Sequence, residues 1–120
     1  MHDIERIAAA RASYGRDLQE SLERIVASLS AMEEVERISL FGSYARGRAD
    51  LFTDLDLLVV MKTAEGILER LRRLYSLLAA PVDLDILCYT PEEFEGMRDR
   101  PFMKRILGEE RVLYEKRSAG

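Results

Sequence analysis

The chain has no tryptophan, one cysteine and one histidine among its 120 residues. The cysteine, Cys88, has no partner for an internal disulfide, and its apolar neighbours favour a buried small side chain over a reactive thiolate. The histidine, His2, stands at a terminus, which leaves almost no candidates for Ser–His or Cys–His catalysis or for a histidine-rich zinc site. Any catalysis must therefore rely on carboxylates.

Long apolar runs and a surplus of basic residues are also missing. No stretch of about 18 apolar residues exists to span a bilayer, and the N-terminus lacks the basic-then-apolar layout of a signal peptide. These absences predict a soluble, cytoplasmic protein without membrane contact. The formal net charge of -4 argues against an extended nucleic-acid surface, because such surfaces depend on many Lys and Arg contacts.

The length and the 48% hydrophobic content suit one compact domain over residues 1–120. We expect an N-terminal amphipathic helix at about 3–30 and a core at about 35–115. Within the helix, apolar residues repeat at helical spacing from Ile4 to about Leu29, and Gly15 is a point where it can bend or split.

Further patterns place helices and strands in the core. Strands are expected over 36–41, 54–60 and 82–89, with a possible edge strand at 112–114. A second helix over 67–78 should bury its apolar residues. The remaining helix signals are an N-cap at Thr90 with a capping box at Glu93, and a short helix opened by Pro101 and ended by Gly108.

Gly42-Ser43 lies where the first of these strands meets a short helix at 43–46. A Gly-Ser turn of this kind exposes backbone N–H groups, which suit a phosphate group. A lone Gly-Ser pair is usually only a turn, so this pair gains meaning from the aspartates that come after it in the chain.

Asp54 and Asp56 are separated by one residue on the next strand, so their side chains should share a face. Neighbouring carboxylates repel each other unless a cation lies between them, and oxygen ligands favour Mg²⁺ or Mn²⁺. The apolar run at 57–60 places the pair at the mouth of a buried strand, where uncompensated charge is costly. The pair therefore predicts a metal site.

The third strand supplies Asp83 and Asp85, again on one face. If this strand lies beside the second, either carboxylate can complete a two-metal site with Asp54 and Asp56. Such a site serves phosphoryl transfer, with the two ions about 3.5–4 Å apart. From the residues alone, the choice between Asp83 and Asp85 stays open.

The motifs Leu-Phe-Gly-Ser-Tyr-Ala-Arg-Gly at 40–47 and Asp-Leu-Asp-Leu-Leu-Val at 54–59 resemble the signature of the minimal nucleotidyltransferases of the DNA polymerase β superfamily. The sequence departs from the family pattern at Tyr44, where Arg is frequent, and at Thr53, where Ser is frequent. Neither departure removes a proposed metal ligand. With the Thr-Pro-Glu-Glu-Phe helix start at 90–94, the resemblance covers about two thirds of the chain.

This resemblance implies the polymerase-β-like α+β fold, a small mixed β-sheet flanked by helices. It also implies transfer of a nucleoside monophosphate, AMP from ATP in the first instance, to an acceptor hydroxyl. Carried over residue by residue, it assigns the nucleotide to Gly42 and Ser43 and the metal, Mg²⁺ or alternatively Mn²⁺, to Asp54 and Asp56. Asp85 is favoured over Asp83 as the third ligand and base, because its distance to Thr90-Pro91 is similar to the family's spacing.

Three basic residues are candidates for neutralising a triphosphate. Arg46 lies inside the family-like segment and is the strongest of them for nucleotide binding. Arg48 and Lys62 fit ordinary surface residues better.

The resemblance implies a partner as well, since minimal members are often paired with a helical protein of the HEPN class in toxin–antitoxin modules. A chain of this length should need another subunit to finish the site, so we expect a homo- or hetero-oligomer contacted through the apolar face of the N-terminal helix. The alternative is that this helix is simply core. Two rival functions are a catalytically silent nucleotide- or partner-binding module of the same fold and a structural domain with an acidic edge. The acceptor is not written in the sequence.

Overall fold

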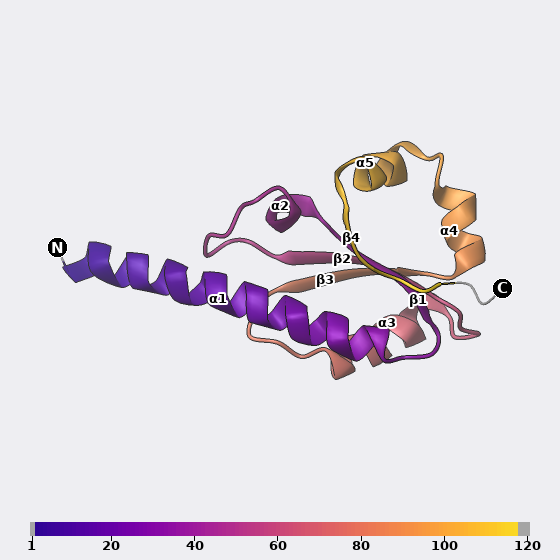
Figure 1. Ribbon diagram of the computed structural model, residues 1–120, viewed down its shortest axis with the longest axis horizontal. Coiled ribbons are helices and arrows are strands. Elements are labelled where there is room, and N and C mark those ends of the chain that lie inside the picture. The colour runs from indigo at the N-terminus through magenta and orange to yellow at the C-terminus, as the bar shows by residue number, and fades with distance from the viewer. Residues whose placement is uncertain (1, 118–120) are drawn as a thin grey trace.

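A computed structural model describes residues 2–117 of the chain. Its elements follow one another as α1 (His2–Ser30), β1 (Val35–Phe41), α2 (Gly42–Ala45), β2 (Leu55–Met61), α3 (Ile67–Leu77), β3 (Leu84–Tyr89), α4 (Pro91–Met97), α5 (Pro101–Glu109) and β4 (Arg111–Glu115) (Figure 1).

The four strands form one mixed sheet in the order β3-β2-β1-β4. Strand β1 runs antiparallel to β2 and β4, whereas β2 and β3 are parallel. With helices on both faces, the structure confirms the α+β fold. The register pairs Asp56 with Phe41 on one side and with Asp85 on the other. The end of β1 and the starts of β2 and β3 therefore meet at one end of the sheet.

Side chains of β2 alternate between two apolar clusters, one on each face of the sheet. Leu55, Leu57 and Val59 belong to the larger cluster, which α1 and α3 cover. Leu58 and Val60 point the other way and pack with buried residues of α4 and α5 (Figure 1). Asp56 shares the parity of Leu58, so it lies on the α4 and α5 face.

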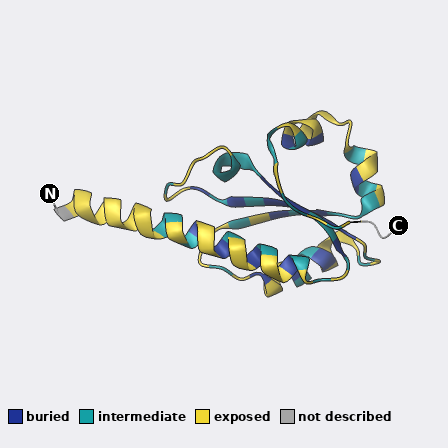
Figure 2. Ribbon diagram, in the orientation of Figure 1, coloured by how far each residue is buried: buried dark blue, intermediate teal, exposed yellow. Residues whose placement is uncertain are grey.

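Helix α1 is continuous through Gly15 and divides into two parts by burial. Leu18, Ile25 and Leu29 are at most 3% exposed and form part of the core. Residues 3–13 are exposed and project beyond the end of the sheet that carries Asp56 (Figure 2). The C-terminal half of the helix is thus core, and only the projecting half is left as a candidate contact surface.

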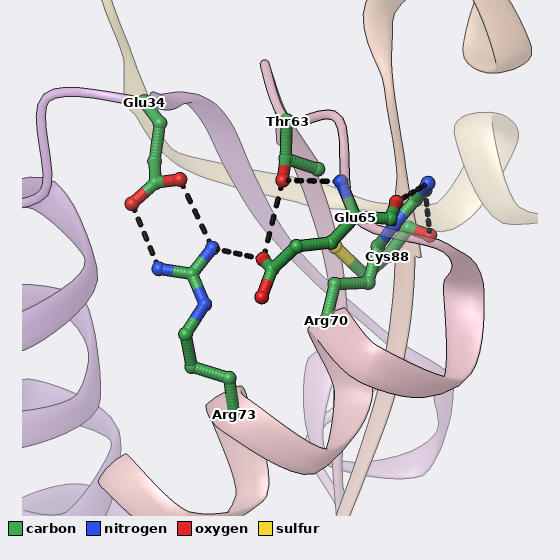
Figure 3. Close-up of polar contacts among 6 residues, drawn as sticks. All are labelled: Glu34, Thr63, Glu65, Arg70, Arg73 and Cys88. Carbon is green, nitrogen blue, oxygen red and sulfur yellow. Dashed lines mark hydrogen bonds and ion pairs between the residues drawn. The ribbon is translucent and has the colours of Figure 1, made fainter.

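A polar network fastens α3 at the opposite end of the sheet (Figure 3). Arg70 is 3% exposed and donates to Glu93 Oε1 at 2.6 Å and to the Cys88 carbonyl at 3.5 Å. Arg73 bridges Glu34 and Glu65, at 2.9 and 2.6 Å. Because Glu93 also closes the capping box with Thr90, as the sequence predicted, the network ties α3, β3 and α4 together. None of these bonds involves the end of the sheet that carries Asp56.

Some expectations were wrong in detail. Strand β2 begins at Leu55 and β3 at Leu84, so Asp54 and Asp83 each lie one residue before a strand. Gly108 does not end α5, which continues to Glu109. In α3, the buried positions are 70 and 74, continued by Leu78 just after the helix, and Ile67, Leu68, Tyr75 and Leu77 are exposed instead of core.

Cys88 is buried, as expected, and burial raises the pKa of its thiol to about 11. Within residues 2–117, no helix combines the length and the apolar character that crossing a membrane requires.

Candidate active site

Gly42 begins α2 directly after β1, and its backbone has a φ of 76°. A Cβ atom added at this position would lie 2.2 Å from Asp56 Oδ2. Only glycine satisfies both conditions, because side chains disfavour positive φ and no atom fits so close to the carboxyl group. The main chain of the Gly42-Ser43 turn therefore lies directly against the Asp56 carboxyl group.

Asp56 and Asp85 are register partners on adjacent parallel strands. The pKa of Asp56 is raised to about 6, first by burial, then by the charges of Asp85 and Asp54, and by a hydrogen bond with Asp85. The pKa of Asp54 is also raised, by burial and by the charges of Asp85 and Asp83. Four carboxyl groups thus act on one another at this end of the sheet.

Such a cluster fits a hard divalent cation in its chemistry, since its side-chain donors are oxygens and their mutual repulsion is what a cation relieves. In the part of the chain that the structure describes, however, no three acidic, histidine or cysteine side chains stand close enough to form a ready-made metal site. Asp56 and Asp85 are brought together, and Asp54 joins them electrostatically. The assignment of Asp54, Asp56 and Asp85 as joint ligands stays a prediction.

The loop before Asp54 is fixed by its own hydrogen bonds. Asp50 N donates to Thr53 Oγ1 at 2.9 Å, and Thr53 N donates to the Asp50 carbonyl at 3.1 Å. The Asp50 carboxylate accepts from Arg48 at 2.6 Å and from Phe52 N at 2.9 Å. The two bonds to the carboxylate, first that from Arg48 and then that from Phe52 N, lower the pKa of Asp50 to about 2.

The three candidate cations have different positions. Arg46 lies beside the Gly42 turn and contacts Glu109 of α5 at 3.0 Å. Arg48 pairs with Asp50. Its charge also lowers the pKa of Asp54, but burial and the charges of Asp85 and Asp83 outweigh this effect. Lys62 follows the far end of β2, where it pairs with Glu36 at 3.5 Å, so it is not part of this site.

Glu109 is a site residue that the sequence did not indicate. Its carboxylate accepts from Gly42 N at 3.3 Å and from Arg46 at 3.0 Å. It therefore engages two of the donors expected to contact a triphosphate. No local pattern could have found it, because Glu109 lies 67 residues from Gly42 and meets it only through the packing of α5 on α2.

Two tyrosines were also missed as site residues. The Tyr14 hydroxyl donates to the Thr53 carbonyl at 2.9 Å, and the Tyr75 hydroxyl accepts from Ile86 N at 2.9 Å. In the sequence both tyrosines belong to the apolar pattern of a helix, which gave no sign of a polar role.

The chain is similar to nucleotidyltransferases of known structure. A solved structure described as a minimal nucleotidyltransferase is 33% identical and has a TM-score of 0.55, with 81% of this chain and 96% of that chain covered. A Sulfolobus solfataricus protein described as a nucleotidyltransferase is 20% identical and has a TM-score of 0.54, with 92% of this chain and 87% of that chain covered. At this identity, the likeness shows the fold alone. A toxin–antitoxin structure with AMP-PNP is 17% identical with a TM-score of 0.52, covering 82% and 73%.

No curated protein matches the chain significantly in sequence. The sequence model of the nucleotidyltransferase domain, in contrast, matches residues 21–114, a span that begins within α1 and ends within β4. It includes the Gly42 turn, Asp56 and Asp85, whose close packing is the central feature of the site. The chain therefore belongs to the nucleotidyltransferase domain family.

Proposed function

We propose that the chain is a Mg²⁺-dependent nucleotidyltransferase that moves a nucleoside monophosphate, AMP from ATP, to an acceptor hydroxyl. The observation that carries this proposal is the packing of the Gly42 main chain against the Asp56 carboxyl group, with Asp85 in register beside it. A glycine turn suited to phosphate and a carboxylate pair in direct contact with it support a triphosphate site next to a metal site. We also propose that residues 1–120 act as a single catalytic domain, with the site inside the core at about 35–115.

Asp54, Asp56 and Asp85 would hold the metal, and Mn²⁺ can replace Mg²⁺ on the same oxygen donors. When bound, the metal would polarise the phosphate oxygens and lower the pKa of the acceptor hydroxyl. Gly42 N and Ser43 would contact the phosphates, and Arg46 would neutralise part of their charge. Since Glu109 engages Gly42 N and Arg46, its carboxylate must leave these donors when the triphosphate binds.

The transfer step forms a bond between the acceptor oxygen and the α-phosphorus of ATP. It breaks the bond from that phosphorus to the oxygen that bridges to the β-phosphorus, and pyrophosphate leaves. The acceptor proton goes to a carboxylate, for which Asp85 is the best placed because it is exposed at the start of β3. Asp56, whose pKa of about 6 keeps it mainly charged at neutral pH, would serve as a ligand.

The proposed partner is a helical protein of the HEPN class, with this chain as the antitoxin or modifying half of the pair. A structural neighbour that is a toxin–antitoxin protein with AMP-PNP supports this association and the adenine nucleotide. The projecting half of α1, where Ile4 and Ile7 are exposed, is the surface that we assign to an oligomeric contact. We propose no extended nucleic-acid surface, in keeping with the net charge of -4.

A labelling experiment tests the activity. The protein is incubated with Mg²⁺, the helical partner, and ATP labelled either at the α- or at the γ-phosphate. We expect protein-bound label from α-labelled ATP alone, and loss of that label in Asp54→Asn and Asp56→Asn.

Other outcomes of the labelling experiment would identify rival functions. Label from γ-labelled ATP would indicate a kinase and contradict the proposal. Binding of nucleotide and partner without any transfer would favour the silent module.

A further inference from the structure

The Tyr14 hydroxyl reaches from α1 to the main chain next to Asp54. It donates to the carbonyl of Thr53, a residue with no exposed surface, at 2.9 Å. Asp54 itself precedes β2, so the sheet ladder does not hold it on its own. The Tyr14 bond is thus a direct link between the last turn of chain before Asp54 and α1, which runs past this end of the sheet (Figure 1).

The Tyr75 hydroxyl makes the corresponding contact next to Asp85, from α3. Leu55 N donates to the Asp83 carbonyl at 2.9 Å, so the odd positions of β3 bond to β2. The N–H of Ile86 therefore faces the free edge of the sheet, where β3 has no neighbouring strand. Tyr75 accepts from that N–H at 2.9 Å. A donor that a parallel edge strand would leave unpaired is satisfied by a side chain.

We propose that Tyr14 and Tyr75 are positioning residues that set the separation of Asp54 and Asp85 by fixing the main chain at Thr53 and Ile86. The inference rests on the proposed metal-dependent function. Neither tyrosine needs to touch the metal or the nucleotide, and both approach from the α1 and α3 face, behind the carboxylates.

The need for such positioning arises from the charges at the site. Asp54, Asp56 and Asp85 repel one another, and Asp54 and Asp85 stand on the two segments that the sheet holds least, a loop and an edge strand. Without an external link, both segments can relax outward and separate the oxygens that the cation must bridge. Groups that orient metal ligands from outside the coordination sphere typically change metal affinity or activity about 10–100-fold when removed.

The test uses the full chain with Tyr14→Phe, Tyr75→Phe and the double variant. Tyr114→Phe is the matched control, because Tyr114, like Tyr14, packs against the larger apolar cluster, and no hydrogen bond of its hydroxyl is found in the described structure. Mn²⁺ alone is titrated into each protein by calorimetry, and circular dichroism reports folding. Amide exchange at Ile86 gives a readout that needs neither metal nor activity.

We expect each single variant to remain folded and to bind Mn²⁺ about tenfold more weakly, with Tyr114→Phe like the parent. Exchange at Ile86 should accelerate in Tyr75→Phe and stay unchanged in Tyr14→Phe. Folded variants that bind Mn²⁺ as tightly as the parent would overturn the inference and leave the proposed function standing. Unfolding of both single variants would also overturn it, since a positioning role requires an intact fold. A parent that binds no Mn²⁺ would instead remove the proposed function and this inference together.

Discussion

Asp56 is restricted by three neighbours: the Gly42 main chain, the Asp85 carboxyl group and the charge of Asp54. Burial and these like charges make its ionised form costly in the metal-free protein. A bound cation would relieve the same cost. The stability of the protein should therefore depend on pH and on metal in a way that isolates this one side chain.

The first expectation concerns Asp56→Asn in EDTA. The folded pKa of about 6 lies above the reference value of 3.8, so the native state binds the proton more tightly than the unfolded state. The protonated Asp56 side chain therefore stabilises the native state at low pH, and this contribution is lost as the pH rises through about 6. Thermal melts should show Asp56→Asn more stable than the parent at pH 8 and equal to it near pH 4.

Asp50→Asn is the matched control, with the opposite sign. The pKa of Asp50 is lowered to about 2, so its charged form stabilises the protein at neutral pH and loses this effect only in acid. Asp50→Asn should melt below the parent at pH 8. An Asp56→Asn protein that also melts below the parent at pH 8 in EDTA would contradict the account of the acidic cluster.

Gly42→Ala should damage the site more than the same change at Gly47, the other glycine of positive φ among the described residues. Both substitutions force alanine into a disfavoured backbone conformation, at a cost of about 1–2 kcal/mol. At Gly47 nothing lies within 4 Å of the added Cβ, whereas at Gly42 that atom would lie 2.2 Å from Asp56 Oδ2. We expect a lower melting temperature and lost nucleotide affinity in Gly42→Ala, and only the lower melting temperature in Gly47→Ala. Equal effects on nucleotide binding would argue against a contact between the turn and the site.

At the scale of elements, local signals explain what was predictable. The Thr90 cap, the strand expected from the apolar run at 57–60 and the Gly42-Ser43 turn each depend on neighbours in sequence, and these predictions are confirmed. The burial of α3 was mispredicted because its buried row includes a charged residue, Arg70, whose partners lie on other elements. Glu109 and the two tyrosines lie at the site only because of tertiary packing, so no spacing in the sequence could predict their positions.

The contact between α5 and the Gly42 turn leads to an expectation for Glu109→Gln. Removing the carboxylate charge frees Gly42 N and Arg46 for the triphosphate, so binding should tighten instead of weaken. Arg46 and Glu109 form an exposed pair, so we expect the binding free energy of MgATP to improve by about 1 kcal/mol, or about fivefold in Kd. Calorimetric titration measures it, with Glu95→Gln as a control of equal charge change. Weaker binding in Glu109→Gln would mean that Glu109 supports the nucleotide site.

At the scale of the whole molecule, α1 carries its apolar face past the body of the protein. The row of Leu18, Ile25 and Leu29 packs on the sheet, and Ile4 and Ile7 continue the same row where no sheet remains, at 72% and 49% exposure (Figure 2). A helix of 29 residues is about 44 Å long, which makes α1 the main contributor to the longest dimension of 58 Å. The expected interface is thus confined to the projecting half.

Replacing Ile4 and Ile7 together by glutamate tests that interface. Because both side chains are exposed, the melting temperature should stay near that of the parent, while light scattering should show a smaller assembly or loss of the helical partner. Ala9→Glu with Ala12→Glu adds the same charge away from the row and should leave assembly intact. A parent that is monomeric with and without the partner would contradict the contact assigned to α1.

The binding of ATP with and without Mg²⁺ tests the central claim most directly, since it needs no acceptor and reports on the turn and the carboxylates together. We expect calorimetry to show ATP binding to the parent that strengthens markedly with Mg²⁺, and Asp56→Asn to lose this strengthening while remaining folded in EDTA. ATP binding that is equally strong without the metal, or equally strengthened by it in Asp56→Asn, would contradict the claim that the Asp56 end of the sheet holds a metal-bound triphosphate.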